Sequence, residues 1–352
     1  MNKKELIGLA RSEMEELLVA MGEPRYRGLQ LYHALYRERR FDLDRITSFP
    51  RALRERLALQ FQATLPEVEQ VYRSGDGTAR YLLRLADGKK IECVYMPEVS
   101  RKTLCISTQV GCPVDCKFCL TGVMGFTRNL TAGEIVGQVL RLCAENHWPA
   151  GEKLNLVFMG MGEPMLNYEN TLAAVRLLAD PEGIGISTAR MTLSTAGVVP
   201  GIERLGEEFV RPKLAVSLNA ATDAVRDRIM PINRKWPIAE LLRACRNFPL
   251  RPREKLTFEY VLLEGVNDSL DDARKLARLV KPLLAKVNLI GLNPGPELDF
   301  RTPPDDQVLA FQQTLRRAGV PAYIRKPRGR DIFAACGQLK LAQLTEVGAR
   351  SA

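Results

Sequence analysis

The residues of this chain best suited to chemistry are three closely spaced cysteines, Cys112, Cys116 and Cys119. Their C-x3-C-x2-C spacing places three thiolates on one tight loop, and such thiolates can hold three irons of a [4Fe–4S] cube. No fourth cysteine lies in the same loop, so one iron would keep an open coordination position. That iron could bind a small molecule and pass it an electron, whereas a cluster used only for electron transfer normally has four protein ligands.

A zinc knuckle is the main alternative for these thiols. A structural zinc site needs four Cys or His ligands. The only histidines, His33 and His147, are not at ligand spacing, although Cys105 could complete a four-cysteine site. We prefer the open cube, because the motifs described below need Cys105 elsewhere.

A second candidate for chemistry is Cys336, which follows the cationic run 325–330. Nearby positive charge is expected to lower the pKa of this thiol and to raise its thiolate fraction. The alternative is an inert buried cysteine beside a solvated basic strip. Cys93, Cys143 and Cys245 sit among apolar neighbours and are expected to be small core residues.

Composition limits the class of protein. The chain has 352 residues, enough for two domains or for one large α/β domain with an extension. No apolar run has the length of a membrane helix, and the charged start lacks a signal-peptide apolar region. We therefore expect a cytoplasmic protein without membrane partners, whose eight cysteines form no permanent disulfides. The net charge of +10 favours an acidic partner such as nucleic acid, although a basic surface without a partner fits the charge equally well.

Alternating strand and helix patterns must position these residues. Residues 1–65 predict a small helical domain with basic side chains, suited to RNA binding or to packing as a cap, and residues 66–101 predict a β-hairpin connector. From 102 to 345 strands alternate with helices, the first of which should begin at Thr131 with a capping box. The strand candidates are Leu104–Val110, Leu154–Met159, Met191–Leu193, Leu214–Val216, Leu256–Leu262 and Val287–Ile290, with a last strand at Ala322–Arg325. Six βα units predict a parallel sheet.

Four of the predicted strand ends carry residues suited to binding a ligand. In parallel sheets chemistry gathers at the carboxyl ends of the strands. The candidates, in chain order, are Gly162, Glu163, Ser194, Ser217, Leu218, Asn219 and Asn293. Each loop alone is weak evidence, since Gly-Pro loops are usually only turns. Their order behind the cysteine loop makes the set specific.

Together with Glu92, Cys105, the stretch 125–130 and the stretch 335–338, these motifs resemble the RlmN/Cfr family of radical S-adenosylmethionine (SAM) rRNA adenine methyltransferases. The likeness runs over nearly the whole chain. It implies an α/β fold, a partial (β/α)6 radical-SAM barrel with a helical N-terminal domain and a β-hairpin extension. It assigns the three clustered cysteines to a [4Fe–4S] cluster and the strand-end residues to SAM.

The resemblance also implies a reaction. Cys336 would take a methyl group from one SAM, and a second SAM would yield the radical that activates this methyl group for addition to C2 of adenine. Cys105 would then attack Cys336 and release the product by forming a disulfide, while Glu92 would remove the C2 proton. The implied substrates are adenine 2503 of 23S rRNA and adenine 37 of some tRNAs, and the implied electron donor is a protein such as flavodoxin.

Two positions depart from the family pattern, and three rival functions stay open. Asn219 stands where His is common, and Pro327 stands where a hydroxyl residue is usual. The rivals are a Cfr-type enzyme that methylates C8 of the same adenine, a radical-SAM enzyme acting on a peptide or a small molecule, and a non-catalytic Fe–S or zinc protein that binds ribosomal RNA. The N-terminal domain and the run Arg325–Arg330 are the expected phosphate contacts.

Overall fold

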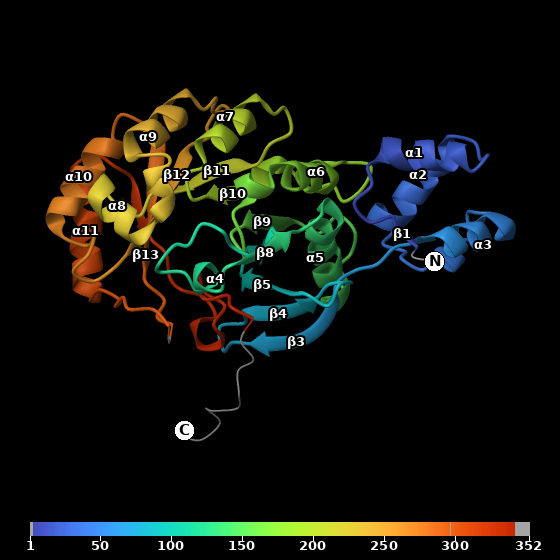
Figure 1. Cartoon of the computed structure of the whole chain (residues 1–352), viewed down its shortest axis with the longest axis horizontal. Coiled ribbons are helices and arrows are strands. Elements are labelled where there is room, and N and C mark those ends of the chain that lie inside the picture. Colours follow the sequence, from blue (N-terminus) through green and yellow to red (C-terminus); the bar gives the residue numbers. More distant parts are fainter. Residues whose placement is uncertain (1–2, 296, 342–352) are drawn as a thin grey trace, which may run out of the picture.

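A mixed ten-stranded sheet forms the centre of the computed structural model, which describes residues 3–295 and 297–341 (Figure 1). Seven neighbouring strands run parallel. They are β6 (Arg101–Cys105), β9 (Leu154–Phe158), β10 (Met191–Thr195), β11 (Lys213–Ser217), β12 (Leu256–Leu262), β13 (Ala285–Gly291) and β14 (Ala322–Ile324). The predicted α/β class with a mostly parallel sheet is confirmed.

Helices follow these strands and lie around the outside of the curved sheet (Figure 1). They are α5 (Ala132–Glu145), α6 (Tyr168–Ala179), α7 (Val199–Glu207), α8 (Asp223–Ile229), α9 (Ile238–Asn247), α10 (Leu270–Val280) and α11 (Asp305–Arg317). Strand residues alternate between the two faces of the sheet. In β10, for example, Met191 and Leu193 are buried in the core, whereas Thr192 and Ser194 are only half-buried. The face away from the helices is therefore polar and accessible to a ligand.

The capping box predicted at the start of α5 is present. The hydroxyl of Thr131 accepts a hydrogen bond from the Glu134 amide at 3.1 Å, and the Glu134 carboxylate accepts one from the Thr131 amide at 2.9 Å. Each bond satisfies a backbone donor that the first helical turn leaves without a partner.

The single strand predicted at Leu104–Val110 is wrong, because residues 106–108 leave the strand with a bend at Thr108. Ser107 lies in this break. There the Gln138 side chain from α5 binds both the amide and the carbonyl of Ser107, at 2.8 and 2.9 Å, in place of a neighbouring strand. The remainder forms β7 (Gln109–Gly111), which pairs antiparallel with β8 (Phe126–Asn129) in a separate two-stranded sheet. This small sheet frames the cysteine loop and the short helix α4 (Leu120–Val123).

The connector before the parallel strands has one strand more than the predicted hairpin. The hairpin is β4 (Ala79–Arg84) and β5 (Lys90–Glu98), and β3 (Glu67–Arg73) adds a third antiparallel strand. Strand β5 pairs antiparallel with β6, so the connector extends the main sheet rather than standing apart from it.

The N-terminal segment is helical and packs on the main domain. It contains α1 (Arg11–Ala20), α2 (Tyr26–Tyr32), a π-helical turn (His33–Arg37) and α3 (Arg51–Gln60), with β1 (Lys4–Glu5) paired to β2 (Phe61–Gln62). The Tyr32 hydroxyl donates to Asp180 at 2.8 Å, and Arg39 donates to the Trp148 carbonyl at 2.7 Å. Buried side chains of this segment belong to the same apolar core as the sheet.

Short 3-10 helices complete the fold: Leu43–Arg45, Pro164–Asn167, Thr188–Arg190, Pro231–Arg234 and Arg330–Ile332. Within the described ranges, the helices are too short or too polar to span a lipid bilayer. The predicted domains 1–65 and 102–345 include residues 1–2, 296 and 342–345, which lie outside the described residues.

The contact between the N-terminal segment and α5 can be tested at Gly133. A Cβ atom there would lie 2.1 Å from the carbonyl oxygen of Ile7, which requires a backbone shift. We expect Gly133→Ala to lower the free energy of unfolding by about 1–3 kcal/mol, even though alanine favours the helix. Denaturant unfolding measures this change. Gly75→Ala is the control because nothing lies within 4 Å of a Cβ at that position, and an equal loss in both variants would contradict the packing argument.

Candidate active site

The cysteine loop is folded tightly between β7 and α4. Gly111 has a φ of +78°, and a Cβ there would lie 2.0 Å from the Gly125 carbonyl oxygen. The same carbonyl accepts a hydrogen bond from the Cys112 amide at 2.9 Å, and the Cys119 amide donates to the Cys116 carbonyl at 3.1 Å. The loop conformation therefore depends on glycine at position 111.

The three thiols of this loop share one environment. They pack against a set of buried apolar residues: Val114, Phe118, Ala196, Ala220, Ile229, Met230, Leu263 and Leu292. Burial raises the pKa of Cys112 to about 12, and burial together with the charges of Cys119 and Cys112 raises the pKa of Cys116. The thiols of Cys112 and Cys116 are thus protonated in the free chain, and a metal that binds them must displace their protons.

The arrangement of the thiols suits a cube better than a single ion. Among the residues that the structure describes, no three His, Cys, Asp or Glu side chains are grouped to hold one metal ion. A [4Fe–4S] cube takes one thiolate per iron, so its thiols surround a space instead of meeting at a point. A buried cation, Arg226, also interacts electrostatically with Cys116. Its positive charge complements an anionic cluster.

Glu163 lies at the carboxyl end of β9 and joins it to the end of β10. Its carboxylate accepts hydrogen bonds from the backbone amides of Met165 at 3.0 Å and Ala196 at 2.6 Å. Burial raises the pKa of Glu163 to about 7, and these donors oppose the rise. Gly162 precedes it with a φ of +105°, and a Cβ there would lie 2.6 Å from the Gln109 side chain. The predicted pair therefore forms a rigid corner of the site.

The predicted residues after β11 differ in what they offer a ligand. Ser217 is half-buried on the polar face of the sheet, whereas the Leu218 side chain is fully buried. Asn219 has a left-handed backbone with a φ of 56°, and its side-chain carbonyl accepts a hydrogen bond from the Val261 amide at 2.8 Å. That side chain holds the loop in place and is already engaged.

Asn293 follows β13 and has a free acceptor. Its amide nitrogen donates to the Cys336 carbonyl at 3.1 Å. Its side-chain oxygen is one of the few buried polar atoms without a partner in the described chain. Buried polar atoms are normally hydrogen-bonded, so this oxygen fits a ligand that donates a hydrogen bond, such as an adenine amino group.

The segment that carries Cys336 lies against the cysteine loop (Figure 1). The Leu120 amide donates to the Gly337 carbonyl at 2.8 Å, and the Thr121 hydroxyl donates to the Leu339 carbonyl at 2.6 Å. Cys105 ends β6, and its pKa is raised by burial and then by the charge of Cys336. Both thiols are free in the structure. The fold thus brings two cysteines that are far apart in sequence close to the three predicted cluster ligands.

The predicted lowering of the Cys336 pKa is wrong. Although the residue is exposed, the protein around its thiol desolvates the thiolate. This desolvation and the charge of Glu259 raise the pKa of Cys336 to about 11, while Arg325 acts in the opposite direction. The cationic run does not surround the thiol, because Arg328 and Arg330 donate to backbone carbonyls elsewhere.

Glu92 is fully buried beneath the same segment. Its carboxylate forms an ion pair with Arg80 at 2.6 Å and accepts a hydrogen bond from the Lys340 amide at 3.0 Å. Burial raises the pKa of Glu92, and the Arg80 charge opposes the rise. Its backbone carbonyl accepts a hydrogen bond from the Ser107 hydroxyl at 2.5 Å, just beyond β6. Residues 336–340 therefore connect the Cys336 position to the Glu92 carboxylate.

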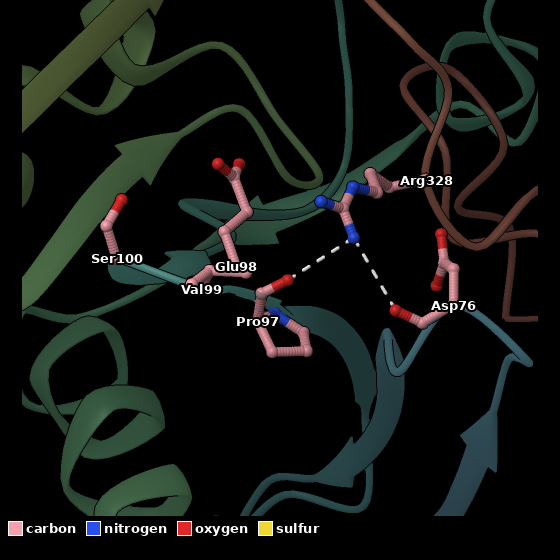
Figure 2. Close-up of a pocket in the computed structure, with 6 residues that line it drawn as sticks. All are labelled: Asp76, Pro97, Glu98, Val99, Ser100 and Arg328. Carbon is pink, nitrogen blue, oxygen red and sulfur yellow. Dashed lines mark hydrogen bonds between the residues drawn. The ribbon is translucent and has the colours of Figure 1, made fainter.

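The basic residues predicted to contact RNA have partly internal roles. Arg328 reaches the connector at a pocket of about 520 Å³, and Figure 2 shows its side chain beside Pro97 and Asp76. Its guanidinium donates to the carbonyls of Pro97 at 3.3 Å and Asp76 at 3.5 Å. Arg325 and Lys326 remain exposed. In the N-terminal segment, Arg25, Arg27, Arg39 and Arg40 all have intramolecular partners.

Two features of the site were missed by sequence reasoning. Glu259 of β12 pairs in register with Ser217 and Asn288, so all three side chains share the polar face. Its carboxylate accepts a hydrogen bond from Asn288 at 2.8 Å. The sequence did offer a signal for Glu259, because it is a charged residue within an otherwise largely apolar strand. Arg226, on helix α8, had no such signal.

Comparisons with known proteins agree with this geometry. A model of the radical SAM superfamily matches residues 106–280, and a model of the N-terminal domain of ribosomal RNA large subunit methyltransferases matches residues 4–62. A crystal structure of a radical SAM methyltransferase from Sphaerobacter thermophilus is 47% identical, with a TM-score of 0.91, and the match covers 96% of this chain and 99% of that one. Fold and site thus define a radical SAM methyltransferase.

Curated relatives narrow the class further. A protein of Koribacter versatilis named probable dual-specificity RNA methyltransferase RlmN is 52% identical over 92% of this chain and 98% of its own length. A dual-specificity RNA methyltransferase RlmN of Syntrophus aciditrophicus is 45% identical over 98% of this chain and 99% of its own. The chain belongs to the RlmN family of radical SAM RNA methyltransferases.

The raised pKa of Cys336 predicts slow alkylation. With a pKa of about 11, roughly one thiol in a thousand is ionised at pH 8. Iodoacetamide should therefore modify Cys336 of the cofactor-free protein more than tenfold more slowly than free cysteine, and faster as pH rises towards 11. Glu259→Gln removes a negative charge and should accelerate the reaction at pH 8. Peptide mass mapping follows the modification, and a rate equal to that of free cysteine would refute the raised pKa of the Cys336 thiol.

The buried Arg80–Glu92 pair predicts a large loss of stability when one partner is removed. Arg80→Met leaves the Glu92 carboxylate buried without its counter-charge, which typically costs about 3–5 kcal/mol. Urea unfolding measures the loss. The exposed pair of Arg51 and Glu55 offers the control, since Arg51→Met should change stability by less than about 1 kcal/mol. Similar losses in both variants would contradict the role of burial.

Proposed function

We propose that this protein methylates C2 of adenine in 23S rRNA and in tRNA, with Cys336 as the carrier of the methyl group. The names of its relatives support the RNA substrate class. The observation that carries the proposal is the position of Cys336 and Cys105, which lie near each other at the cysteine loop. A radical SAM enzyme without a methylcysteine intermediate has no use for this pair.

The cofactors are a [4Fe–4S] cluster and SAM, with two SAM molecules used per turnover. Cys112, Cys116 and Cys119 hold the cluster. When bound, cluster and SAM supply a one-electron cleavage that yields a carbon radical. Gly162, Glu163, Ser194, Ser217 and Leu218 line the SAM site, and Asn219 holds its loop.

Asn293 completes this SAM site through its partnerless side-chain oxygen, which accepts a hydrogen bond from the adenine amino group. Its amide also fixes the Cys336 carbonyl, so the same residue faces both cofactor and methyl carrier.

The remaining residues act on the substrate base. Cys336 carries the methyl group, and after addition its sulfur is joined to the base through the resulting methylene carbon. The Cys105 thiolate then attacks the Cys336 sulfur, so that the S–CH2 bond breaks as the disulfide forms. The electron pair of the broken bond stays on the methylene carbon, which takes up a proton and becomes the methyl group of the product. Glu92 accepts the proton from C2. Because the Lys340 amide and the Arg80 guanidinium occupy its carboxylate, the segment 336–340 has to shift before the base reaches it.

The setting of the reaction follows from the substrate. The protein works in the cytoplasm and takes electrons from a donor such as flavodoxin. Arg325 and Lys326 are exposed basic residues shortly before Cys336 in sequence, and they contact RNA phosphates. The target base must leave its stack to reach a site beneath the C-terminal segment.

Anaerobic reconstitution followed by nucleoside analysis tests this function. With SAM, a reductant and 23S rRNA, the protein should form 2-methyladenosine. Cys336→Ala should abolish the product, and Cys105→Ala should accumulate a covalent protein–RNA adduct visible as a shifted band. Cys143→Ala is the matched control, because this cysteine is buried in α5 and the charged groups that act on it, Arg39 and Glu152, do not belong to the site.

The outcomes separate the rival functions. Formation of 8-methyladenosine would replace C2 by C8 as the target. Release of 5′-deoxyadenosine that persists unchanged in Cys336→Ala, without RNA methylation, would indicate a different substrate. A protein that binds RNA but never cleaves SAM would overturn the enzymatic proposal.

A further inference from the structure

Arg226 of α8 binds two of the strand ends that form the site. Its side chain is fully buried. The guanidinium donates to the carbonyls of Ala196 at 2.6 Å, Ser217 at 3.1 Å and Leu218 at 2.9 Å, and to the side-chain oxygen of Asn233 at 3.0 Å. One side chain therefore fixes the loop after β10 against the loop after β11.

The backbone around Arg226 leaves room for it. Gly197 has a φ of +106°, and a Cβ there would lie 3.2 Å from the guanidinium. The carbonyls that Arg226 binds belong to Ser217 and Leu218, which are predicted SAM contacts, and to Ala196, whose amide binds Glu163. Without Arg226, these residues would no longer be held in a fixed orientation relative to one another.

The charge of Arg226 has no direct carboxylate partner in the described part of the chain. All four acceptors are neutral oxygens, and the carboxylates of Asp223 and Asp227 bind the Asn233 amide at 3.0 and 2.7 Å. Burial lowers the pKa of Arg226 to about 10, so the side chain is still charged at neutral pH. Fully buried charges are rarely found without a paired opposite charge.

Of the acidic groups that act on Arg226, Cys116 of the cysteine loop comes first, ahead of Asp223 and Asp227. The Lys117 amide donates to the Ile229 carbonyl at 2.9 Å, which joins the loop to the end of α8. Ile229 also lies in the apolar set that packs against the three thiols. Three thiolates around a cube make an anionic group, and each added electron makes it more negative. A fixed cation beside it favours the reduced state.

We propose that Arg226 is the buried counter-charge of the iron–sulfur cluster and also the clamp of the SAM-binding loops. It acts through the cluster and the loops and is therefore a positioning residue. The inference rests on the proposed cluster and goes beyond it, because it assigns to one side chain both the ease of cluster reduction and the affinity for SAM.

Two variants separate charge from hydrogen bonding. Arg226→Gln removes the charge. Arg226→Lys keeps the charge but has its donors on a single nitrogen, so it cannot reproduce the bonds that the three guanidinium nitrogens make to the two loops and to Asn233. At a fixed ambient potential, the reduced-to-oxidised ratio of the cluster should fall about tenfold in Arg226→Gln, which corresponds to about 59 mV for a one-electron couple. In Arg226→Lys the ratio should stay within about threefold of the unchanged protein.

SAM affinity should follow the hydrogen bonds instead. The dissociation constant of SAM should rise about tenfold in both variants, as measured by anaerobic equilibrium dialysis without RNA. Arg211 supplies the matched control, since it is also buried but pairs with Glu254 and binds the carbonyls of Pro212 and Pro249 at the opposite ends of the strands. Arg211→Gln should leave both the cluster titration and the SAM affinity unchanged.

Redox titration of the reconstituted full chain decides between the outcomes. The paramagnetic signal of the reduced cluster monitors the titration. If the unchanged protein binds no iron and sulfide, the proposed function fails and not this inference alone. If Arg226→Gln holds a full cluster and titrates like the unchanged protein, the counter-charge is refuted. If Arg226→Gln does not fold, the measurements on Arg226→Lys decide. An unchanged SAM affinity in Arg226→Lys refutes the clamp. A tenfold loss of reduced cluster in Arg226→Lys refutes the charge assignment.

Discussion

The site depends on the hydrogen bonds that hold the C-terminal segment against the cysteine loop. Gly337 and Leu339 accept from Leu120 and Thr121, and the Cys336 carbonyl accepts from Asn293. Each partner lies far from the segment in sequence, so these contacts form only when the parallel strands have assembled. Cys336 therefore has its observed position only in the assembled fold, and the geometry of the whole sheet determines where it lies.

The sheet serves the site by keeping one face polar. Ser217, Glu259 and Asn288 lie in register on neighbouring strands, and their side chains point away from the core helices. Desolvation is the main reason why the pKa of Cys336 differs from the sequence expectation, and the Glu259 carboxylate of this row raises the pKa further. A carboxylate on the polar face influences Cys336 more strongly than the arginines that precede it in the chain.

The parts of the fold that follow local patterns were predictable, and those that need distant partners were not. Strand β12 was predicted with its observed bounds, and the capping box at Thr131 needs only four consecutive residues. The break at Ser107 depends on the Gln138 amide from another element. The cluster cysteines could be predicted from their spacing. The role of Arg226 could not, because it binds carbonyls of two loops that the sequence does not place together.

The buried polar groups of the site also make the stability of the protein depend on cofactor binding. Arg226 has no carboxylate partner in the described chain, and the side-chain oxygen of Asn293 has no hydrogen-bond partner there. Buried polar groups left unsatisfied cost about 1–3 kcal/mol each, and charged groups cost more. A ligand that satisfies them recovers this free energy and stabilises the native state by an amount that grows with the logarithm of its concentration above the dissociation constant. The same groups that lower the stability of the cofactor-free chain are thus the ones that select an anionic cluster and a ligand that donates a hydrogen bond to Asn293.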